Sequence, residues 1–443
     1  MSASGIRRSV TTVTLTVIGL PLIVWLVYLD QVRLLLLEEA ILSDLDIASS
    51  LTADTRQWIP TKYTWKDFSV AGVNLATYGL QPPASVRERQ QSAPPFQLYA
   101  DFDLSSQIKG NETWFDLVRY RRDVQEPTLP FYVDKVARRR WLQAHQIPAP
   151  HAYANFYQSE WTQQSPHANE QEQHLLTLLP MDLDFVAKPT HLSCSGGVWL
   201  TKTVNGTLFL GNGKQKFKPV TNNDHTIDTT RQNIAKDLVK SLHTVQEKCA
   251  GKIPESWALQ NVHPGVFIED RFTGWEANDD DRAGMEFKVF TIWGKAWMVV
   301  YRPGYDHVGG FFFPNGTAMP WEMQKTGKQL DPVPDWMDWK RLIAIAERLG
   351  AHKDMFRTDI FVGIPSRKRR LLGPTATPHD FLAAVEIAVS ETEVHPTPYG
   401  KETNEVFEEG SRLWLAGYRI GNYLVVPNTE VPPAFVQSGE FAL

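Results

Sequence analysis

Alternating apolar and polar positions predict several strands in the second half of the chain. Residues 385–391 alternate along their whole length, and Phe356–Val362 is rich in β-forming residues, so both stretches are expected to be strands. Glu286–Trp293 and Ala296–Arg302 alternate in the same way and are separated by a Gly-Lys turn, which predicts a hairpin.

Apolar residues at helical spacing predict three helices, at 134–145, 233–249 and Trp339–Leu349. Helices interleaved with antiparallel hairpins indicate an α+β fold. The arginine run Arg138–Arg140 is most simply a solvated face of the first helix, while Lys135 in the same helix can reach a nucleotide bound beside it.

Two of the strands carry the residues of a candidate metal site. Arg357 and Asp359 share one strand face, and Glu391 and Glu393 share another, because residues two apart point the same way. If the strands pair, three carboxylates and a guanidinium meet. Mg²⁺ is held by a few carboxylates together with substrate phosphates, so the set suits a metal–nucleotide site. The alternative is a solvated strand edge that carries charges.

A candidate phosphate site lies earlier in the chain. Residues 182–188 form an apolar strand that ends on Lys188, and the Ser/Gly-rich turn Ser193–Gly197 follows at once. Such a turn brings amide N–H groups and an ammonium close to phosphate oxygens. The next residues, 198–210, predict a hairpin with an Asn-Gly turn, on which the loop can fold like a flap. An ordinary hairpin turn is the alternative.

In this order the chain resembles the ATP-grasp superfamily, and within it the TupA-like branch typified by teichuronopeptide-biosynthesis proteins. The resemblance covers most of the chain between its stem and its tail. It runs through these segments: Tyr132–Lys135, Phe185–Lys188, Ser193–Gly197, Phe267–Asp270, Glu286–Lys288, Arg357–Asp359 and Glu391–Glu393.

The resemblance implies an ATP-grasp fold, in which ATP lies between two antiparallel sheet subdomains, and it implies a role for each matching residue. Lys135 and Lys188 would bind ATP phosphates, and Glu269 and Asp270 would bind the adenine and the ribose. The loop residues Ser193, Ser195, Gly196 and Gly197 would cover the β- and γ-phosphates. Asp359, Glu391 and Glu393 would hold Mg²⁺, and Lys288, Arg302 and Arg357 would be catalytic cations for the transferred phosphoryl group.

The chain departs from the family pattern in three places. Many members have Glu-x-Asn where this chain has Glu391-Thr-Glu393, which leaves the role of Glu393 open. The acid before Lys288 is Glu286 in place of the usual Asp. An insertion, 365–381, carries four adjacent cations, which are either a contact for an anionic substrate or, more simply, a solvated hairpin tip.

Composition limits the classes of protein and of site that the chain can form. A chain of 443 residues with 42% hydrophobic content is ample for a core with several subdomains. Its formal net charge of -5 shows no nucleic-acid footprint, so no nucleic-acid partner is expected. With only Cys194 and Cys249, a disulfide framework and a cysteine-based zinc site are both excluded.

The N-terminal region predicts a membrane anchor. Val10–Leu29 has no charged residue and is long enough to span a bilayer. Arg7 and Arg8 precede it and acids crowd the other side, so the N-terminus is expected in the cytosol and the catalytic part in the secretory-pathway lumen. A cleaved signal peptide is the rival, but the apolar stretch exceeds a usual signal core. An inverted topology also stays open, because a lumenal enzyme needs imported ATP.

The expected organisation follows from these assignments. The parts are a cytosolic tail (1–9), a signal anchor (10–29), a stem (30–112), an N-terminal ATP-grasp subdomain (113–187), a lid subdomain (188–265), a nucleotide- and metal-binding subdomain (266–402) and a C-terminal tail (403–443).

The expected function is a single-pass membrane ligase that uses Mg-ATP to activate a carboxylate through an acyl phosphate and form an amide. The branch suggests a glycan-linked carboxylate and a role in polysaccharide biosynthesis. The alternatives are a kinase that phosphorylates a glycan or polyol hydroxyl, and a nucleotide-binding module without catalysis.

Overall fold

The computed structural model describes residues within one unit of the chain, Lys62–Leu443. The predicted anchor and most of the stem lie outside the described residues. No described helix has the length and apolar character needed to cross a membrane. The described residues are 98–101, 103–162, 168–180, 184–204, 207–212, 218–219, 227–245, 247–249, 253–277, 282–304, 308–319, 331–373, 375–396, 404–420, 423–425 and 428–431.

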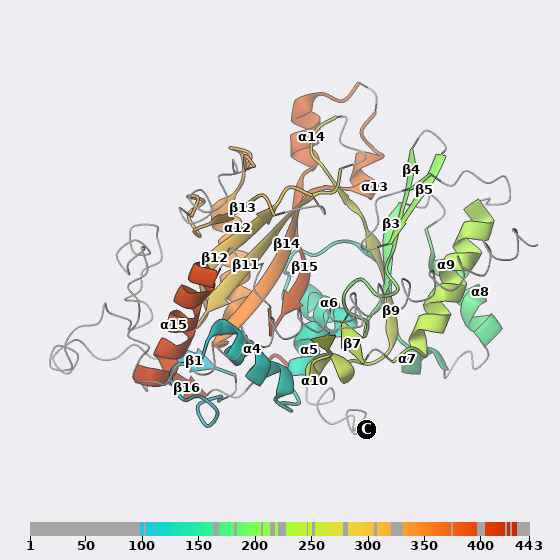
Figure 1. The fold of residues 1–443 in the computed structure, drawn as a ribbon. Helices are drawn as coiled ribbons and strands as arrows, with labels where there is room; N and C mark the ends of the chain where they lie inside the picture. The colour runs from blue at the N-terminus through green and yellow to red at the C-terminus, as the bar shows by residue number, and fades with distance from the viewer. Residues whose placement is uncertain are drawn as a thin grey trace, which may run out of the picture. The chain divides into compact units, whose positions relative to one another are not determined.

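The first sheet has six antiparallel strands in the order β2-β9-β3-β4-β5-β6 (Figure 1). Helices α8 (Ala168–Leu178) and α9 (Ile227–Leu242) pack together and cover one face of this sheet. The strands are β2 Ala152–Tyr157, β3 Phe185–Pro189, β4 Trp199–Val204, β5 Thr207–Asn212, β6 Lys218–Pro219 and β9 Gly265–Asp270.

The second sheet also has six strands, in the order β10-β14-β11-β12-β13, with β15 paired to β14. All of its pairings are antiparallel. The strands are β10 Phe272–Thr273, β11 Met285–Ile292, β12 Lys295–Arg302, β13 Gly310–Phe312, β14 Met355–Pro365 and β15 Glu386–Glu393.

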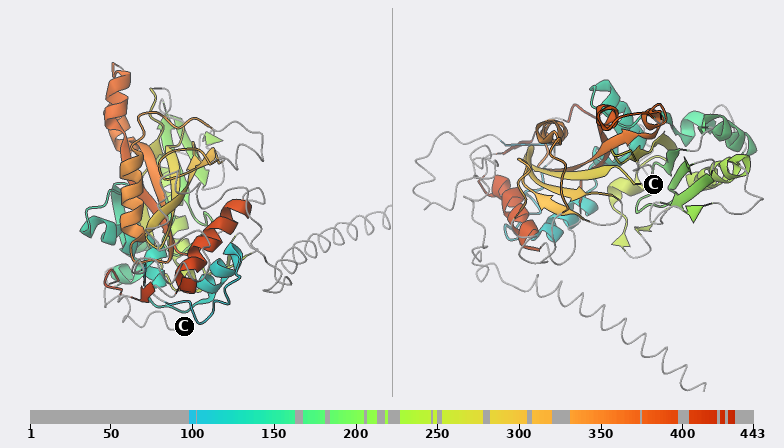
Figure 2. Two further views of the ribbon diagram at one scale, coloured as in Figure 1. Left: turned by 90° about the vertical axis from the view of Figure 1, so that its left-hand side faces the viewer. Right: turned by 90° about the horizontal axis from the view of Figure 1, so that it is seen from above.

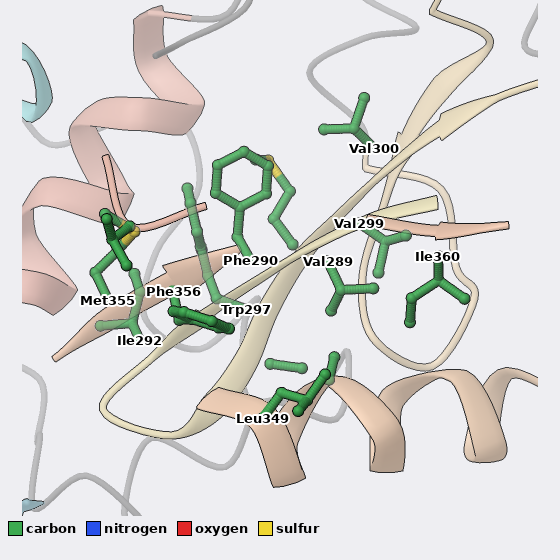
Figure 3. Close-up of a cluster of buried hydrophobic side chains, with 14 of the residues drawn as sticks. Val289, Phe290, Ile292, Trp297, Val299, Val300, Leu349, Met355, Phe356 and Ile360 are labelled. Atoms are coloured by element: carbon green, nitrogen blue, oxygen red, sulfur yellow. The ribbon is translucent and has the colours of Figure 1, made fainter. Parts of the chain in front are cut away.

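The two faces of the second sheet are covered by different helices. Val289, Val299 and Ile360 lie on the side where Leu349 of α12 (Trp339–Gly350) packs, and Phe290 lies on the opposite side (Figure 3). Phe290 meets aromatic residues of α4 (Trp114–Asp123) and α15 (Asn404–Ile420). Because side chains alternate along β11, Glu286 and Lys288 lie on the same face as Phe290, beyond the region that these helices cover.

Helix α15 shows that residues 403–443 are more than a tail. Trp414 is fully buried, and its indole N–H donates to Asp354 at 2.7 Å. Gly417 lies so close to Trp293 that an added Cβ would come within 2.2 Å of the ring. This helix therefore completes the core of the second sheet.

Helix α6 (Lys135–Ala144) begins where the sequence indicates. The Asp134 carboxylate caps it by accepting from the N–H groups of Val136 (2.8 Å) and Ala137 (3.0 Å). The helix packs on β2 and β9, and Figure 1 places it between β9 and β15. It therefore contacts the first sheet while it faces the strand that carries Glu391.

The remaining elements are short. The helices are α5 Leu129–Val133, α7 Gln158–Thr162, α10 Trp257–Gln260, α13 Ser366–Arg369 and α14 Pro378–Ala384. Two small sheets join β1 Leu98–Ala100 to β16 Tyr423–Val425 in parallel, and β7 Lys248–Cys249 to β8 Ile253–Pro254 in antiparallel. Figure 2 shows the arrangement of the elements from two further directions.

The predicted strands and helices are mostly confirmed, with one clear exception. The helix expected at 233–249 is α9, which ends at Leu242. The ring Nε2 of His191 lies 3.1 Å from the carbonyl oxygens of both Ser241 and Thr244, so it satisfies acceptors that a helix end leaves free. Val245, which fits the apolar stripe in the sequence, is 84% exposed.

The expected subdomain boundaries also differ from the sheets. The proposed boundary after residue 187 falls inside β3, and the one after residue 265 falls inside β9. Because β3 pairs with β4, the N-terminal and lid segments belong to one sheet, and β9 of the third segment lies in it between β2 and β3.

Candidate functional site

Asp359 is the centre of a buried ion-pair cluster on the second sheet. Its side chain is 0% exposed, and Arg357 donates to both of its oxygens, from Nε at 2.7 Å and from Nη2 at 3.0 Å. Lys288 of β11, its direct register partner, donates to Oδ2. Burial alone would raise the pKa of Asp359, but Arg357 and Lys288 outweigh it and hold the pKa below its usual value.

The cluster extends across the sheet through Glu286. This carboxylate accepts from Lys288 at 3.1 Å and from Nη1 of Arg302 at 2.7 Å. Arg302, Glu286, Lys288, Asp359 and Arg357 thus form a row of alternating charge over three neighbouring strands. The structure brings the three predicted catalytic cations together, each already paired with an acid.

Strands β14 and β15 pair as the sequence analysis requires. Asp359 is the direct partner of Glu391, and Arg357 is the direct partner of Glu393, with a register shift just beyond Asp359. Glu391 is ionised despite its burial, because Lys135, Lys188 and Arg138 hold its pKa below the usual value. Glu391 is therefore the acid of the second sheet whose ionised form is stabilised by cations of α6 and of the first sheet.

The Glu393 carboxylate is already paired with the nearby His395. Its Oε1 lies 2.7 Å from His395 Nδ1 and also accepts from the His395 N–H at 3.0 Å. Burial opposes ionisation of Glu393, but His395 and Arg357 together keep its pKa below the usual value. In this geometry the carboxylate belongs to a Glu–His pair beside Arg357.

The first-sheet side of the site contributes two lysines, Lys188 on β3 and Lys135 at the start of α6. Lys188 Nζ lies 2.5 Å from Glu269 Oε1, and the Lys188 side chain is 12% exposed. Lys135 donates to the carbonyl oxygens of Thr190 (2.9 Å) and Leu192 (3.1 Å), just beyond β3. Burial is the main reason that the pKa of Lys135 falls to about 8, and Lys188 lowers it further. Two phosphate-binding candidates therefore lie beside one another.

The arginine run of α6 corrects a sequence-based interpretation. Arg138 is only 2% exposed, and its Nη2 donates to the Ser390 carbonyl oxygen at 2.8 Å. Arg139 is half-buried, and only Arg140 is exposed, where it pairs with Glu160 at 2.9 Å. The run is not a solvated face, because α6 turns Arg138 and Arg139 toward the two sheets.

The Ser193–Gly197 loop is anchored at its first residues. Ser193 Oγ donates to Glu255 Oε2 at 2.5 Å, and Cys194 is disulfide-bonded, with Cys249 the only other cysteine in the sequence. Cys194 and Ser195 both have positive φ, 52° and 63°, and Gly196 N–H closes the turn on Ser193 O at 2.8 Å. One disulfide therefore restrains this loop, which the cysteine count of the sequence did not predict.

Asp270 lies away from the lysines. Its Oδ1 accepts from the Tyr153 hydroxyl at 2.6 Å, and its Oδ2 lies 2.7 Å from Arg367 Nε. The predicted ribose contact is thus a tie between β9 and α13, while Glu269, one residue earlier, points to Lys188.

The cationic insertion also has structural partners. Lys368 pairs with Glu386 at 2.8 Å, and buried Arg369 donates to the carbonyl oxygens of Gly274 (2.8 Å) and Ala277 (3.1 Å). Together with the pair between Arg367 and Asp270 of β9, these contacts hold the cationic part of the insertion against both sheets. The described residues from Leu371 to Asp380 are mostly exposed, so the expectation of a solvated tip holds for them and not for the paired cations.

The carboxylates at the site are of the type that binds Mg²⁺, but two of them are available in place of the three expected from the sequence. Asp359 and Glu391 supply ionised carboxylate oxygens on paired residues, which are the ligands that Mg²⁺ takes together with phosphates and water. Within the described part of the chain, no three acidic, histidine or cysteine side chains form a metal cluster. The three-carboxylate shell expected from the sequence is not assembled here, and a metal role for the pair stays a prediction.

Comparisons with known proteins give only distant structural likenesses. No family model matches the chain, and no curated protein matches it in sequence. A D-cycloserine synthetase aligns with 67% of this chain and 71% of its own length, at 12% identity and a TM-score of 0.34. The D-alanine–D-alanine ligase of Bacillus anthracis, complexed with ATP, aligns with 66% of this chain and 68% of its own length, at 11% identity and a TM-score of 0.29.

A third solved structure has similar statistics. The RiPP-associated ATP-grasp ligase of Chryseobacterium gregarium, in complex with ADP and a leader and core peptide, covers 69% of this chain and 67% of its own length, at 8% identity and a TM-score of 0.28. These neighbours are ligases or synthetases by name, but likenesses this weak carry no argument. The functional proposal therefore depends on the residues themselves.

Proposed function

We propose that the chain is an ATP-dependent ligase of the ATP-grasp type. The observation that carries this proposal is the meeting of two charge groups. Lys135 and Lys188, from the first-sheet side, keep Glu391 of the second sheet ionised, and Glu391 is the direct partner of Asp359. Cations that suit phosphate oxygens thus face a carboxylate pair that suits a phosphate-bound cation.

The residues divide into two sets of roles. Lys188 and Lys135 would bind the phosphate chain, and Lys188 would exchange Glu269 for a phosphate oxygen when the nucleotide enters. Asp359 and Glu391 would hold Mg²⁺, which neutralises phosphate charge when bound. Arg357 and Lys288, which now neutralise Asp359, would turn to the transferring phosphoryl group, because both contact the carboxylate that would hold the phosphate-bound Mg²⁺.

The reaction in this proposal has two steps. A substrate carboxylate oxygen attacks the γ-phosphorus, the bond to the β–γ bridging oxygen breaks, and ADP leaves. The amine nitrogen of the second substrate then attacks the acyl carbon, phosphate leaves, and the amine loses a proton. Such transfers depend on charge neutralisation and alignment, which a row of paired cations provides.

The proposal also includes the location and the substrate class. We propose a type II membrane protein, anchored by Val10–Leu29, with its catalytic part in the secretory pathway. The disulfide at Cys194 supports this location, because disulfides persist in oxidising compartments. A glycan-linked carboxylate and the TupA-like branch remain proposals that follow from the sequence resemblance.

The test is a screen of the purified protein for ADP release with carboxylates, alone and with amines, in the presence of Mg²⁺. The expected result is carboxylate-dependent ADP release that hydroxylamine converts to a stable hydroxamate, the product of a trapped acyl phosphate. ADP release with hydroxyl substrates and no hydroxamate would instead identify a kinase. Absence of nucleotide binding by calorimetry would reject both activities.

A further inference from the structure

One face of helix α6 carries more cations than the proposed ligase roles use. Lys135, Arg138 and Arg139 are spaced i, i+3 and i+4, so they lie on the same side of the helix. Lys135 contacts the segment just after β3, and Arg138 contacts β15. The shared face is therefore turned toward the region between the two sheets.

Arg138 and Arg139 both have unused donors. Nη1 of Arg138 is buried without a hydrogen-bond partner, although the residue is only 2% exposed. Nε of Arg139 is likewise buried and unpartnered, and the Arg139 side chain forms no hydrogen bond or ion pair with any residue that the structure describes. A buried cationic donor without an acceptor is costly, so these groups indicate a place where an anion binds.

The local charges also favour binding of an anion at this face of α6. Arg139 lies in the field of Glu269, the partner of Lys188, and burial is the main cause of its lowered pKa. Lys135, Arg138, Arg139 and Lys188 are four cations, and Glu269, Glu391 and Asp134 are three acids that interact with them. One positive charge is thus in excess on this side of the site.

We propose that this face of α6 is a phosphate-binding surface and that Arg139 contacts the phosphate chain of the nucleotide directly. The inference rests on the proposed nucleotide site and adds a residue to it that the sequence motif does not identify. A guanidinium forms charge-assisted, bidentate hydrogen bonds to phosphate oxygens, and the unused donors of Arg139 match this ligand. Arg138 has a different role, because it holds β15 beside Glu391.

Arg140 provides a matched control within the same helix. It has the same charge and the adjacent position, but it is exposed and pairs with Glu160 on the outside of the protein. Replacement of Arg139 or Arg140 by Gln removes one positive charge in each case. A general electrostatic effect would therefore be the same in both variants, whereas a direct phosphate contact would be lost only in Arg139→Gln.

The experiment measures binding of AMP, ADP and inorganic tripolyphosphate by calorimetry, without substrate, to the wild-type protein, Arg139→Gln, Arg139→Lys and Arg140→Gln. The expected result is that Arg139→Gln weakens ADP and tripolyphosphate binding by about tenfold or more, the loss typical of a hydrogen bond to a charged group. AMP binding should change by less than about threefold, Arg139→Lys should recover part of the loss, and Arg140→Gln should resemble wild type. Thermal melting confirms that the variants are folded.

The outcomes separate this inference from the proposed function. Equal ADP affinity in wild type and Arg139→Gln would overturn the inference while the nucleotide site stands. A similar loss in Arg140→Gln would also overturn it, because the effect would then be general charge. If the wild-type protein binds tripolyphosphate through Arg139 but no nucleotide, the phosphate surface is supported and the ligase proposal fails. If it binds neither, both are rejected.

Discussion

Asp359 of β14 and Glu391 of β15 are direct cross-strand partners, and each is ionised by a different group of cations. Asp359 is neutralised by Arg357 and Lys288 of its own sheet, whereas Glu391 is held ionised by Lys135, Lys188 and Arg138. The pair thus lies where the two halves of the site meet.

The first prediction concerns the metal. Asp359→Asn and Glu391→Gln should each raise the Mg²⁺ concentration needed for half-maximal activity by about tenfold or more, since each removes an ionised ligand. Glu393→Gln should shift this midpoint less, because its carboxylate is already paired with His395. A magnesium titration of ADP release measures all three. If Glu393→Gln raised the Mg²⁺ midpoint as much as the other two variants, Glu393 would be a third metal ligand and this prediction would be wrong.

Asp359→Asn should also lower stability in a pH-dependent way. Loss of one partner from a buried ion pair costs roughly 3–5 kcal/mol. The cost here should lie toward the lower end, because Lys288 keeps its contact with Glu286. The folded-state pKa of Asp359 is lowered, so its stabilisation is present above its unfolded pKa of about 3.9 and is lost as the pH falls through the folded value. Urea unfolding at pH 7 and pH 3.5 should show a larger difference between the proteins at pH 7.

Lys188→Met should weaken ADP binding, because it removes a charge-assisted phosphate contact worth roughly 1.5–3 kcal/mol. Lys295→Met is the matched control, since Lys295 is the first residue of β12 and, among the described residues, pairs with half-buried Glu347. Calorimetry should show at least about tenfold weaker binding in the first variant and no change in the second. Unchanged affinity in Lys188→Met would mean that the nucleotide binds elsewhere.

Nucleotide affinity should fall as the pH rises through about 8, where buried Lys135 loses its charge. Lys135→Arg should flatten this dependence, because a guanidinium stays protonated. The folding stability that Lys135 contributes should instead rise with pH. The unfolded lysine binds more protons than the folded one between pH 8 and about 10.4, so the wild type gains stability relative to Lys135→Met in this window. ADP binding and thermal melting between pH 7 and 10 test both statements.

The disulfide at Cys194 should stabilise the loop region. Its reduction, or Cys194→Ser, should lower the free energy of unfolding by about 2–4 kcal/mol. Denaturant unfolding with and without reductant measures this, and non-reducing peptide mapping identifies the bonded partner. If reductant leaves the wild-type curve unchanged, the crosslink is not present in the folded protein.

The sequence by itself determined the chemistry that is available and much of the strand pattern. The alternation in Glu286–Trp293 and 385–391 correctly predicted strands, because strand periodicity is a local property. That the carboxylates of two strands would meet depended on the strands pairing, and β14 and β15 do pair, with Asp359 opposite Glu391. The same local logic located the start of α6 at its Asp134 cap.

Tertiary structure decided where the charges point and what they touch. Arg138 and Arg139 form part of a polar run in the sequence, yet packing of α6 on β2 and β9 buries the first and partly buries the second. Asp270 and Glu269 are neighbours in the sequence, but strand alternation sends one to Arg367 and the other to Lys188. Such contacts join residues far apart along the chain, and only the packing of the elements determines their distance.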